Sequence, residues 1–158
     1  MKRLFLILLL AMAVPGGAGA APALRSFTAE SWLQLRSAYA GKPLIVHFWG
    51  VTCAPCLEEL PHVAALLRDH PGMAVMLVHA ETAPPARVAR VLERSGLSGH
   101  ESWMSFGPVD QSLRSAVDPD WIGEMPRTML IARDGSVTTI SGKADMDRLA
   151  RWWTEQAP

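Results

Sequence analysis

The sequence contains few cysteines and no apolar run long enough to cross a membrane. Cys53 and Cys56 are the only cysteines among its 158 residues. Two cysteines are too few for the multi-bridge framework of a small secreted scaffold. They are also only half of a closed four-ligand zinc site, and the five histidines lack the spacing that would complete one. Residues 4–14 are apolar, but a membrane-spanning helix needs about 20 such residues.

Charge is also scarce. Charged residues make up 19% of the chain, and its 15 basic and 15 acidic residues balance. No basic cluster or stripe is visible in the sequence, so we expect no nucleic-acid partner. No internal repeat and no low-complexity segment occurs beyond the Ala/Gly/Pro-rich start. Since 49% of the residues are hydrophobic, one domain can form its own core, and we expect a monomer.

The start of the chain has the pattern of a signal peptide. Lys2 and Arg3 precede the apolar run 4–14, a Pro-Gly-Gly segment follows, and residues 18–20 read Ala-Gly-Ala. This order of a basic region, a short apolar region and a small-residue cleavage site is typical of exported proteins. We therefore expect a signal peptide at 1–20 and one domain at 21–158, with an uncleaved membrane anchor as the alternative. Disulfides persist in the compartments that such proteins reach.

The remaining pattern predicts an α/β fold. Two continuous apolar runs, 43–50 and 73–80, indicate strands buried on both faces of a sheet. Residues 127–142 predict two strands joined at Asp134-Gly135. Helices are predicted at 27–41, 54–70, 84–96, 111–116 and 145–156. Alternating strands and helices with a late hairpin indicate a central mixed sheet with helices on both faces.

The cysteine pair lies where this pattern changes from strand to helix. Cys53 is expected at the first turn of the helix 54–70, where free backbone N–H groups and the helix dipole stabilise a thiolate. Cys56 follows one turn later and is expected to face inward, within reach of the Cys53 sulfur. This placement favours a redox-active dithiol in which Cys53 attacks and Cys56 resolves the mixed disulfide. The alternatives are half of a zinc site and a structural disulfide, which would constrain so short a loop little.

Two further segments give a more specific resemblance. The strand ending in Phe48-Trp49, the C-x-x-C motif, Pro61 inside the next helix and Met125-Pro126 before the hairpin resemble the thioredoxin-like fold. Together with the signal-like start, "CAPCLEELP" and "GEMPRTMLIARDG" resemble the exported TlpA-like branch of that superfamily. This branch includes ResA-type and cytochrome c maturation reductases. The resemblance covers roughly residues 28–157.

The resemblance implies a three-layer sandwich and a role for five residues. Cys53 matches the nucleophile and Cys56 the resolving thiol, so the redox group would be their disulfide, with no further cofactor and no metal. Pro126 matches the family's cis-proline, and Met125 precedes it. With Trp49, the aromatic residue beside the site, these two are the expected substrate-binding residues.

Proton transfer to and from Cys56 has two candidate groups. His47 occupies the position of a buried acid in ordinary thioredoxins, and Glu81 matches a glutamate that lies beneath the disulfide in ResA-like proteins. The resemblance implies that both approach Cys56 from adjacent strands, where, if both face inward, they would form a hydrogen-bonded pair that titrates as a unit. We expect Glu81, together with His47, to take the proton of Cys56.

Several residues depart from the family pattern or admit two interpretations. Thr52 replaces the usual Trp, and its hydroxyl is expected to cap the helix at the N–H of Ala54. Arg127 is expected either to place a positive charge near the site, which would favour acidic partners, or to be solvated. Glu58 and Glu59 are expected to be early-helix charges that are favourable to the helix dipole but oppose the formation of a thiolate nearby.

These inferences predict a periplasmic thiol–disulfide oxidoreductase. The resemblance implies that it reduces disulfides of specific exported proteins, such as apocytochromes c or copper-assembly proteins, and receives electrons from a thiol protein in the membrane. A disulfide-introducing oxidant is the first alternative, because the spacing of the cysteines does not determine the direction of exchange. The second alternative is a copper assembly factor that holds copper(I) with both cysteines and a His or Met.

Overall fold

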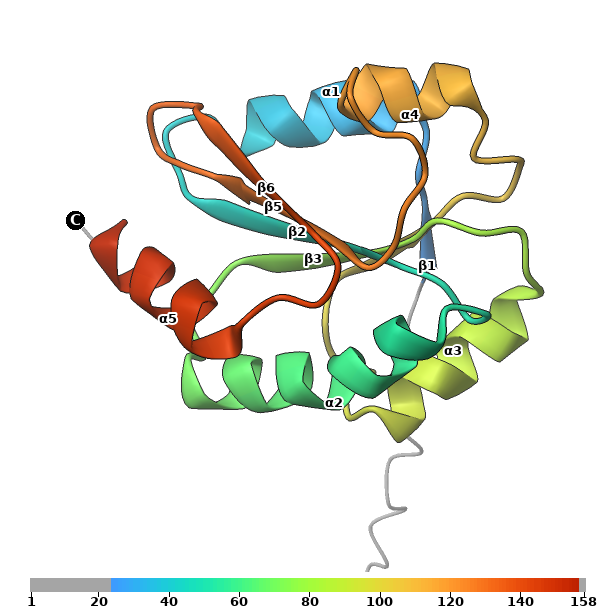
Figure 1. Ribbon diagram of the computed structural model, residues 1–158, viewed down its shortest axis with the longest axis horizontal. Coiled ribbons are helices and arrows are strands. Elements are labelled where there is room, and N and C mark those ends of the chain that lie inside the picture. The colour runs from blue at the N-terminus through green and yellow to red at the C-terminus, as the bar shows by residue number, and fades with distance from the viewer. Residues whose placement is uncertain (1–23, 157–158) are drawn as a thin grey trace, which may run out of the picture.

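The computed structural model describes residues 24–156. Its elements along the chain are β1 (Leu24–Ser26), α1 (Ala29–Ala38), β2 (Leu44–Trp49), α2 (Ala54–Asp69), β3 (Val75–His79), α3 (Pro85–Arg94), β4 (Ser102–Met104), α4 (Gln111–Val117), β5 (Arg127–Ile131), β6 (Val137–Ser141) and α5 (Met146–Glu155). Helices α1 and α4 cover one face of a sheet, and α2, α3 and α5 cover the other (Figure 1). The predicted α/β sandwich is confirmed.

The sheet has six strands in the order β1-β4-β3-β2-β5-β6. Strands β1, β4, β3 and β2 run parallel, and β5 and β6 are antiparallel to their neighbours. The predicted mixed sheet is therefore confirmed, but β1 and β4 were not predicted. Each has only three residues, which is too short for a hydrophobic period to show in the sequence.

Strand β2 lies at the centre of the sheet and divides the core in two. All six of its residues are buried, as its continuous apolar run predicted. Ile45 and Trp49 join the cluster under α2, whereas Val46 and Phe48 join the cluster under α1 and α4. This alternation follows from the two-residue period of a strand and decides which β2 side chains lie on the α2 face.

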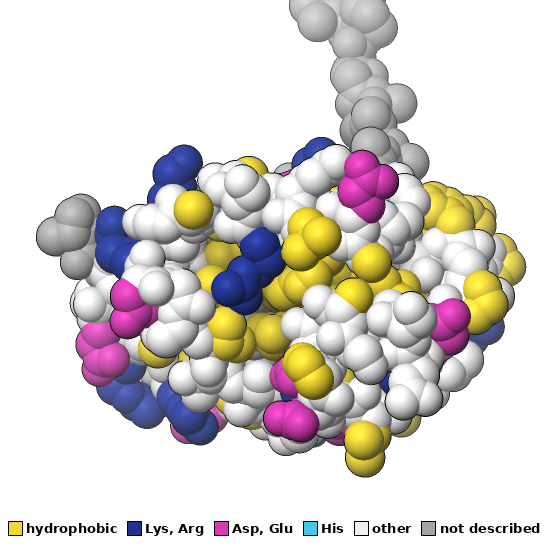
Figure 2. Space-filling model, turned by 90° about the horizontal axis from the view of Figure 1, so that it is seen from above, with side chains coloured by type: hydrophobic (Ala, Val, Ile, Leu, Met, Phe, Trp, Pro, Cys, Tyr) yellow, Lys and Arg dark blue, Asp and Glu magenta, His cyan; other side chains and the backbone are white. Residues whose placement is uncertain are grey.

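Figure 2 shows the face that carries α1 and α4. Hydrophobic side chains gather in a hollow across its middle, and charged side chains lie mostly around its edge. Leu33 and Phe106 are among the exposed large hydrophobic side chains of the described chain. The cysteine pair belongs to the opposite, α2 face of the sheet.

The predicted signal peptide at 1–20 and the domain boundary after it lie outside the described residues. Within residues 24–156, no helix combines the length and the apolar character that a membrane crossing requires.

Candidate dithiol site

Cys53 is the N-cap of α2, at the end of the loop that leaves β2. Its Sγ accepts a hydrogen bond from the backbone N–H of Cys56, with an N–S distance of 3.3 Å. Pro55 follows in the first turn, where a backbone N–H has no partner within the helix. The backbone N–H of Cys56 therefore points at this sulfur at the start of the helix, as the sequence predicted.

The two cysteines form a disulfide but differ in exposure. Cys53 is partly exposed, whereas Cys56 has an exposed fraction of 0% and packs in the core cluster under α2. A partner molecule can therefore reach only the sulfur of Cys53. This asymmetry agrees with the expected division between an attacking and a resolving sulfur.

The Met125-Pro126 peptide bond is cis and precedes β5. Pro126 is buried, and its carbonyl accepts a hydrogen bond from the Gly142 N–H at 2.8 Å. Met125 is partly buried and packs against the same cluster as Cys53. Met125 also packs against the cluster on the other face of the sheet, so it lies where the two core clusters meet.

Trp49 does not fit the expected contact with a substrate. Its exposed fraction is 0%, and its ring packs edge-on against the His79 ring, with 5.1 Å between centroids. As the last residue of β2, it points into the core below the loop that carries Cys53. Trp49 therefore supports the site from within and has no surface to offer a partner.

Glu81 is held beside the dithiol by Thr52. The Thr52 backbone N–H donates to Glu81 Oε2 at 3.0 Å, and the Thr52 hydroxyl donates to Oε1 at 2.8 Å. The expectation that Thr52 caps the helix at Ala54 is therefore wrong, because Cys53 is the cap and the hydroxyl binds a carboxylate 29 residues away. The residue before Cys53 thus connects the first cysteine to the expected proton acceptor.

His47 lies on the α2 face of the sheet but bonds elsewhere. Its Nδ1 is 3.0 Å from the Thr128 hydroxyl on the neighbouring strand β5. Burial lowers the pKa of His47 to about 4, so the imidazole is neutral near pH 7. The structure pairs Glu81 with Thr52 and His47 with Thr128, and the expected hydrogen-bonded pair of His47 and Glu81 is not formed within residues 24–156.

His79 is a member of the site that the sequence analysis missed. Its exposed fraction is 0%, and its Nε2 lies 4.0 Å from Glu81 Oε2. Burial lowers its pKa to about 4, a shift that the Glu81 carboxylate opposes and the Arg87 guanidinium reinforces. Strand alternation was the available signal, since Leu77 and His79 stand two residues apart on the same buried face.

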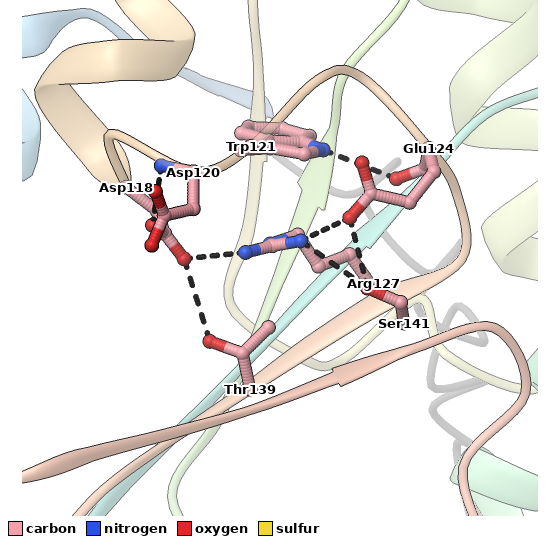
Figure 3. Close-up of polar contacts among 7 residues, drawn as sticks. All are labelled: Asp118, Asp120, Trp121, Glu124, Arg127, Thr139 and Ser141. Carbon is pink, nitrogen blue, oxygen red and sulfur yellow. Dashed lines mark hydrogen bonds and ion pairs between the residues drawn. The ribbon is translucent and has the colours of Figure 1, made fainter.

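Arg127 is buried rather than exposed near the dithiol. Its guanidinium is ion-paired with Asp118 and Glu124 and lies over the Trp121 ring, 5.7 Å from the centroid (Figure 3). Its side chain has an exposed fraction of 5% and points to the α4 side of the sheet. Both expectations for Arg127 are therefore wrong, because its charge is neutralised inside the protein on the face opposite the cysteines.

The carboxylates around Arg127 are adapted to this charge. Burial favours the neutral form of Asp118, but hydrogen bonds from Asp120 and Arg127 and the Arg127 charge outweigh it, so the pKa is lowered. The pKa of Glu124 is also lowered, because burial is outweighed by hydrogen bonds and by the Arg127 charge. The cluster ties the segment 118–126 to the start of β5, directly beside Pro126.

Glu58 and Glu59 differ, although they are neighbours on α2. Glu58 is exposed and pairs with Lys143 at 2.8 Å. Glu59 has an exposed fraction of 2%, and its Oε1 accepts the Ala144 N–H at 2.7 Å. Neither carboxyl lies in the first turn of α2, where the helix dipole acts most strongly. Burial raises the pKa of Glu59, although the Ala144 hydrogen bond and the Lys143 charge act against this shift.

Helix α3 carries a basic stripe that the sequence analysis did not identify. Arg87, Arg90 and Arg94 are exposed and, with Glu93, line a hollow on the protein surface.

Residues 24–156 contain no group of three or more His, Cys, Asp or Glu side chains placed to hold a metal ion.

No protein-family model matches the chain. Curated proteins similar to it are described as thiol-disulfide oxidoreductase ResA. The chain is 30% identical over 102 residues to thiol-disulfide oxidoreductase ResA of Halalkalibacterium halodurans, which covers 63% of this chain and 53% of that protein. The chain thus spans about half the length of the curated relatives it matches.

Solved structures share the fold at lower identity. A thiol:disulfide interchange protein of the thioredoxin family from Chlorobium tepidum matches with a TM-score of 0.63 and 18% identity, over 90% of this chain and 99% of that one. A secreted Mycobacterium tuberculosis disulfide oxidoreductase matches with a TM-score of 0.61 and 16% identity, over 75% and 85% of the two chains.

Proposed function

We propose that this chain, whose fold is thioredoxin-like and whose sequence is similar to ResA, is a thiol–disulfide oxidoreductase whose redox group is the Cys53–Cys56 disulfide. The observation that carries the proposal is the contrast between the two sulfurs. Cys53 is a partly exposed helix N-cap, and Cys56 is fully buried behind it. Such a pair suits thiol exchange, because one sulfur meets the partner and the other closes the ring.

The proposed reaction transfers two electrons from the reduced pair to a partner disulfide. The Cys53 thiolate attacks one partner sulfur, the partner S–S bond breaks, and the released partner sulfur takes a proton. The Cys56 thiol then loses its proton, and its sulfur attacks Cys53. The Cys53–Cys56 bond forms as the bond between Cys53 and the partner breaks, and the second partner sulfur leaves as a thiolate that takes a proton from water.

Glu81 is the proposed acceptor of the Cys56 proton. Cys56 is fully buried, so its thiol resists ionisation and requires a base. Glu81 is tied by two hydrogen bonds to Thr52, the residue before Cys53, and its side chain has an exposed fraction of 17%. It can therefore exchange the proton with water after taking it from the site. His47 bonds to Thr128 instead, which favours Glu81 as the principal base.

The proposed setting is the periplasm, and the proposed substrates are disulfides of exported proteins such as apocytochromes c or copper-assembly proteins. A membrane thiol protein would return electrons to the pair. The signal-like pattern of residues 1–20 supports export, as does the likeness to a structure described as secreted. Met125 and Pro126 would contact the partner, since Met125 packs against the core cluster that includes the dithiol and is joined to Pro126 by the cis peptide bond.

Trapping the mixed disulfide tests this proposal. In a Cys56→Ala variant, Cys53 can attack a partner but nothing resolves the product, so a disulfide-linked partner should accumulate in cells and be identifiable by mass spectrometry. Cys53→Ala is the matched control and should trap nothing. Equal labelling of both cysteines by an alkylating reagent in the reduced protein would contradict the proposed division of roles. A redox potential well above that of glutathione would contradict the reducing direction.

A further inference from the structure

His79 is a buried titratable side chain for which the proposed reaction has no role. It ends β3, has no exposed surface, and packs against the Trp49 ring. Within the described residues, neither of its ring nitrogens has a hydrogen-bond partner. A neutral imidazole must carry one N–H, and an N–H buried without an acceptor is costly.

One acceptor lies close to this imidazole. Glu81 Oε2 is 4.0 Å from His79 Nε2, which is about one ångström longer than a hydrogen bond. The same oxygen already accepts the Thr52 N–H, and a carboxylate oxygen can accept two donors. A small movement of the Glu81 side chain therefore gives His79 the partner that it lacks.

We propose that His79 is a positioning residue for Glu81, offering Nε2–H to the carboxylate while Thr52 holds it from the other side. The inference rests on the proposed function and deepens it, because Glu81 is the proposed proton acceptor for Cys56. A donor from His79 stabilises the charged carboxylate, which is the form that accepts a proton. His79 thus sets the pH at which the buried thiol can be activated.

The surroundings of His79 support a neutral donor rather than a permanent cation. The neighbouring strands present Trp49 and Met104 to it, and neither carries a charge. The charged groups acting on it are Glu81 and, from α3, Arg87. The core cluster on this face of the sheet includes the uncharged disulfide of Cys53 and Cys56. Because the Arg87 charge and burial both oppose protonation, the imidazole remains neutral and keeps an N–H available.

The test uses three substitutions in the full chain and follows oxidation of the reduced protein by oxidised glutathione, in which Cys56 must lose its proton, over about pH 5 to 9. His79→Gln places an amide N–H near the Nε2 position and should keep the pH midpoint of exchange. His79→Asn is too short to reach, and His79→Leu has no donor. Both should move the midpoint to higher pH by about half a unit or more. Equal midpoints in all three folded variants would overturn the proposal.

A measurement on the unsubstituted protein keeps the test independent of folding. Nitrogen-15 NMR of the His79 ring should show the Nε2–H tautomer, with an Nε2 shift that changes when Glu81 is replaced by Gln. A ring protonated at Nδ1 alone would overturn the proposal. A wild-type protein that exchanges no disulfide with oxidised glutathione would instead contradict the proposed function, so the two failures are distinguishable.

Discussion

Gly50 and the Glu81 carboxyl occupy adjoining space at the base of the dithiol loop. A Cβ built on residue 50 would lie 2.7 Å from Glu81 Oε2 and closer still to Oε1. Any side chain at residue 50 must therefore displace the carboxylate from its two bonds with Thr52. The close approach of the Glu81 carboxyl is what requires glycine at this position. The backbone conformation does not require it, because the Gly50 φ angle lies outside the left-handed region.

Gly50→Ala is therefore expected to disturb proton transfer while leaving the fold intact. The group that must move is the end of a flexible side chain, so the free energy of unfolding should change by less than about 1 kcal/mol. Disulfide exchange near neutral pH should slow by about tenfold or more, because a misplaced base loses much of its effect. Gly72→Ala, where an added Cβ meets nothing within 4 Å, is the matched control. Equal exchange rates in both variants would count against Glu81 as the base.

The buried imidazole of His47 should make the protein sensitive to acid. Its pKa is about 4 when folded and about 6.5 when unfolded, so the unfolded chain binds the proton more tightly. The contribution of His47 to the free energy of unfolding is therefore fully present above pH 6.5 and is lost as the pH falls toward 4. The loss amounts to about 3 kcal/mol. His47→Gln should reduce this loss in urea unfolding measured at several pH values. His62→Gln changes an exposed position, so the loss of unfolding free energy at acid pH should be the same as in the wild type.

Removing the Arg127 charge should destabilise the segment before the cis-proline. Arg127→Met leaves two partly buried carboxylates without a counter-ion, and we expect a loss of about 2–3 kcal/mol in unfolding free energy. Arg127→Lys should lose less, since it keeps the charge but not the forked geometry. Arg94→Met, an exposed arginine, serves as the control, with an expected change within about 0.5 kcal/mol.

The same variant should change the response to acid. The lowered pKa values of Asp118 and Glu124 mean that their stabilisation is present above their ordinary values of 3.8 and 4.5 and is lost as the pH falls below them. Wild-type stability should therefore fall more steeply below pH 4.5 than that of Arg127→Met. Parallel curves would show that the ion pairs contribute nothing in solution.

Glu59 should show the opposite dependence. Its pKa is raised by burial, so the folded protein binds this proton more tightly than the unfolded chain does. Ionised Glu59 therefore lowers the free energy of unfolding. This loss of stability develops as the pH rises from about 4.5 through the pKa of Glu59 in the folded protein. Glu59→Gln keeps an oxygen for the Ala144 N–H and should be at least as stable as the wild type at pH 8. A marked loss of stability at pH 8 would mean that the charge itself is needed.

The sequence predicted the elements that depend on local pattern. The continuous apolar runs of β2 and β3, the Asp134-Gly135 hairpin and the helix that follows Cys53 are all present, within a few residues of the expected bounds. Strands β1 and β4 depend on pairing with distant neighbours and carry too few residues to show a period.

The site was predicted less completely, because its contacts are long-range. Thr52 has a suitable side chain for a helix cap, yet a carboxylate 29 residues later binds it instead. Arg127 and Glu59 are charged residues of the kind usually found on the surface. Arg127 is buried by the packing of α4 against the sheet, and Glu59 is buried by the packing of the loop before α5 against α2. Their burial depends on partners that no local pattern identifies.

The complete burial of Cys56 also affects how two partners would share this protein. A molecule that delivers electrons and a molecule that receives them must both meet the same sulfur, that of Cys53, because no second entrance exists among the described residues. The two therefore compete for one docking position and visit it in turn. Steady-state rates measured against both partners should accordingly follow a ping-pong pattern, with each partner inhibiting at high concentration.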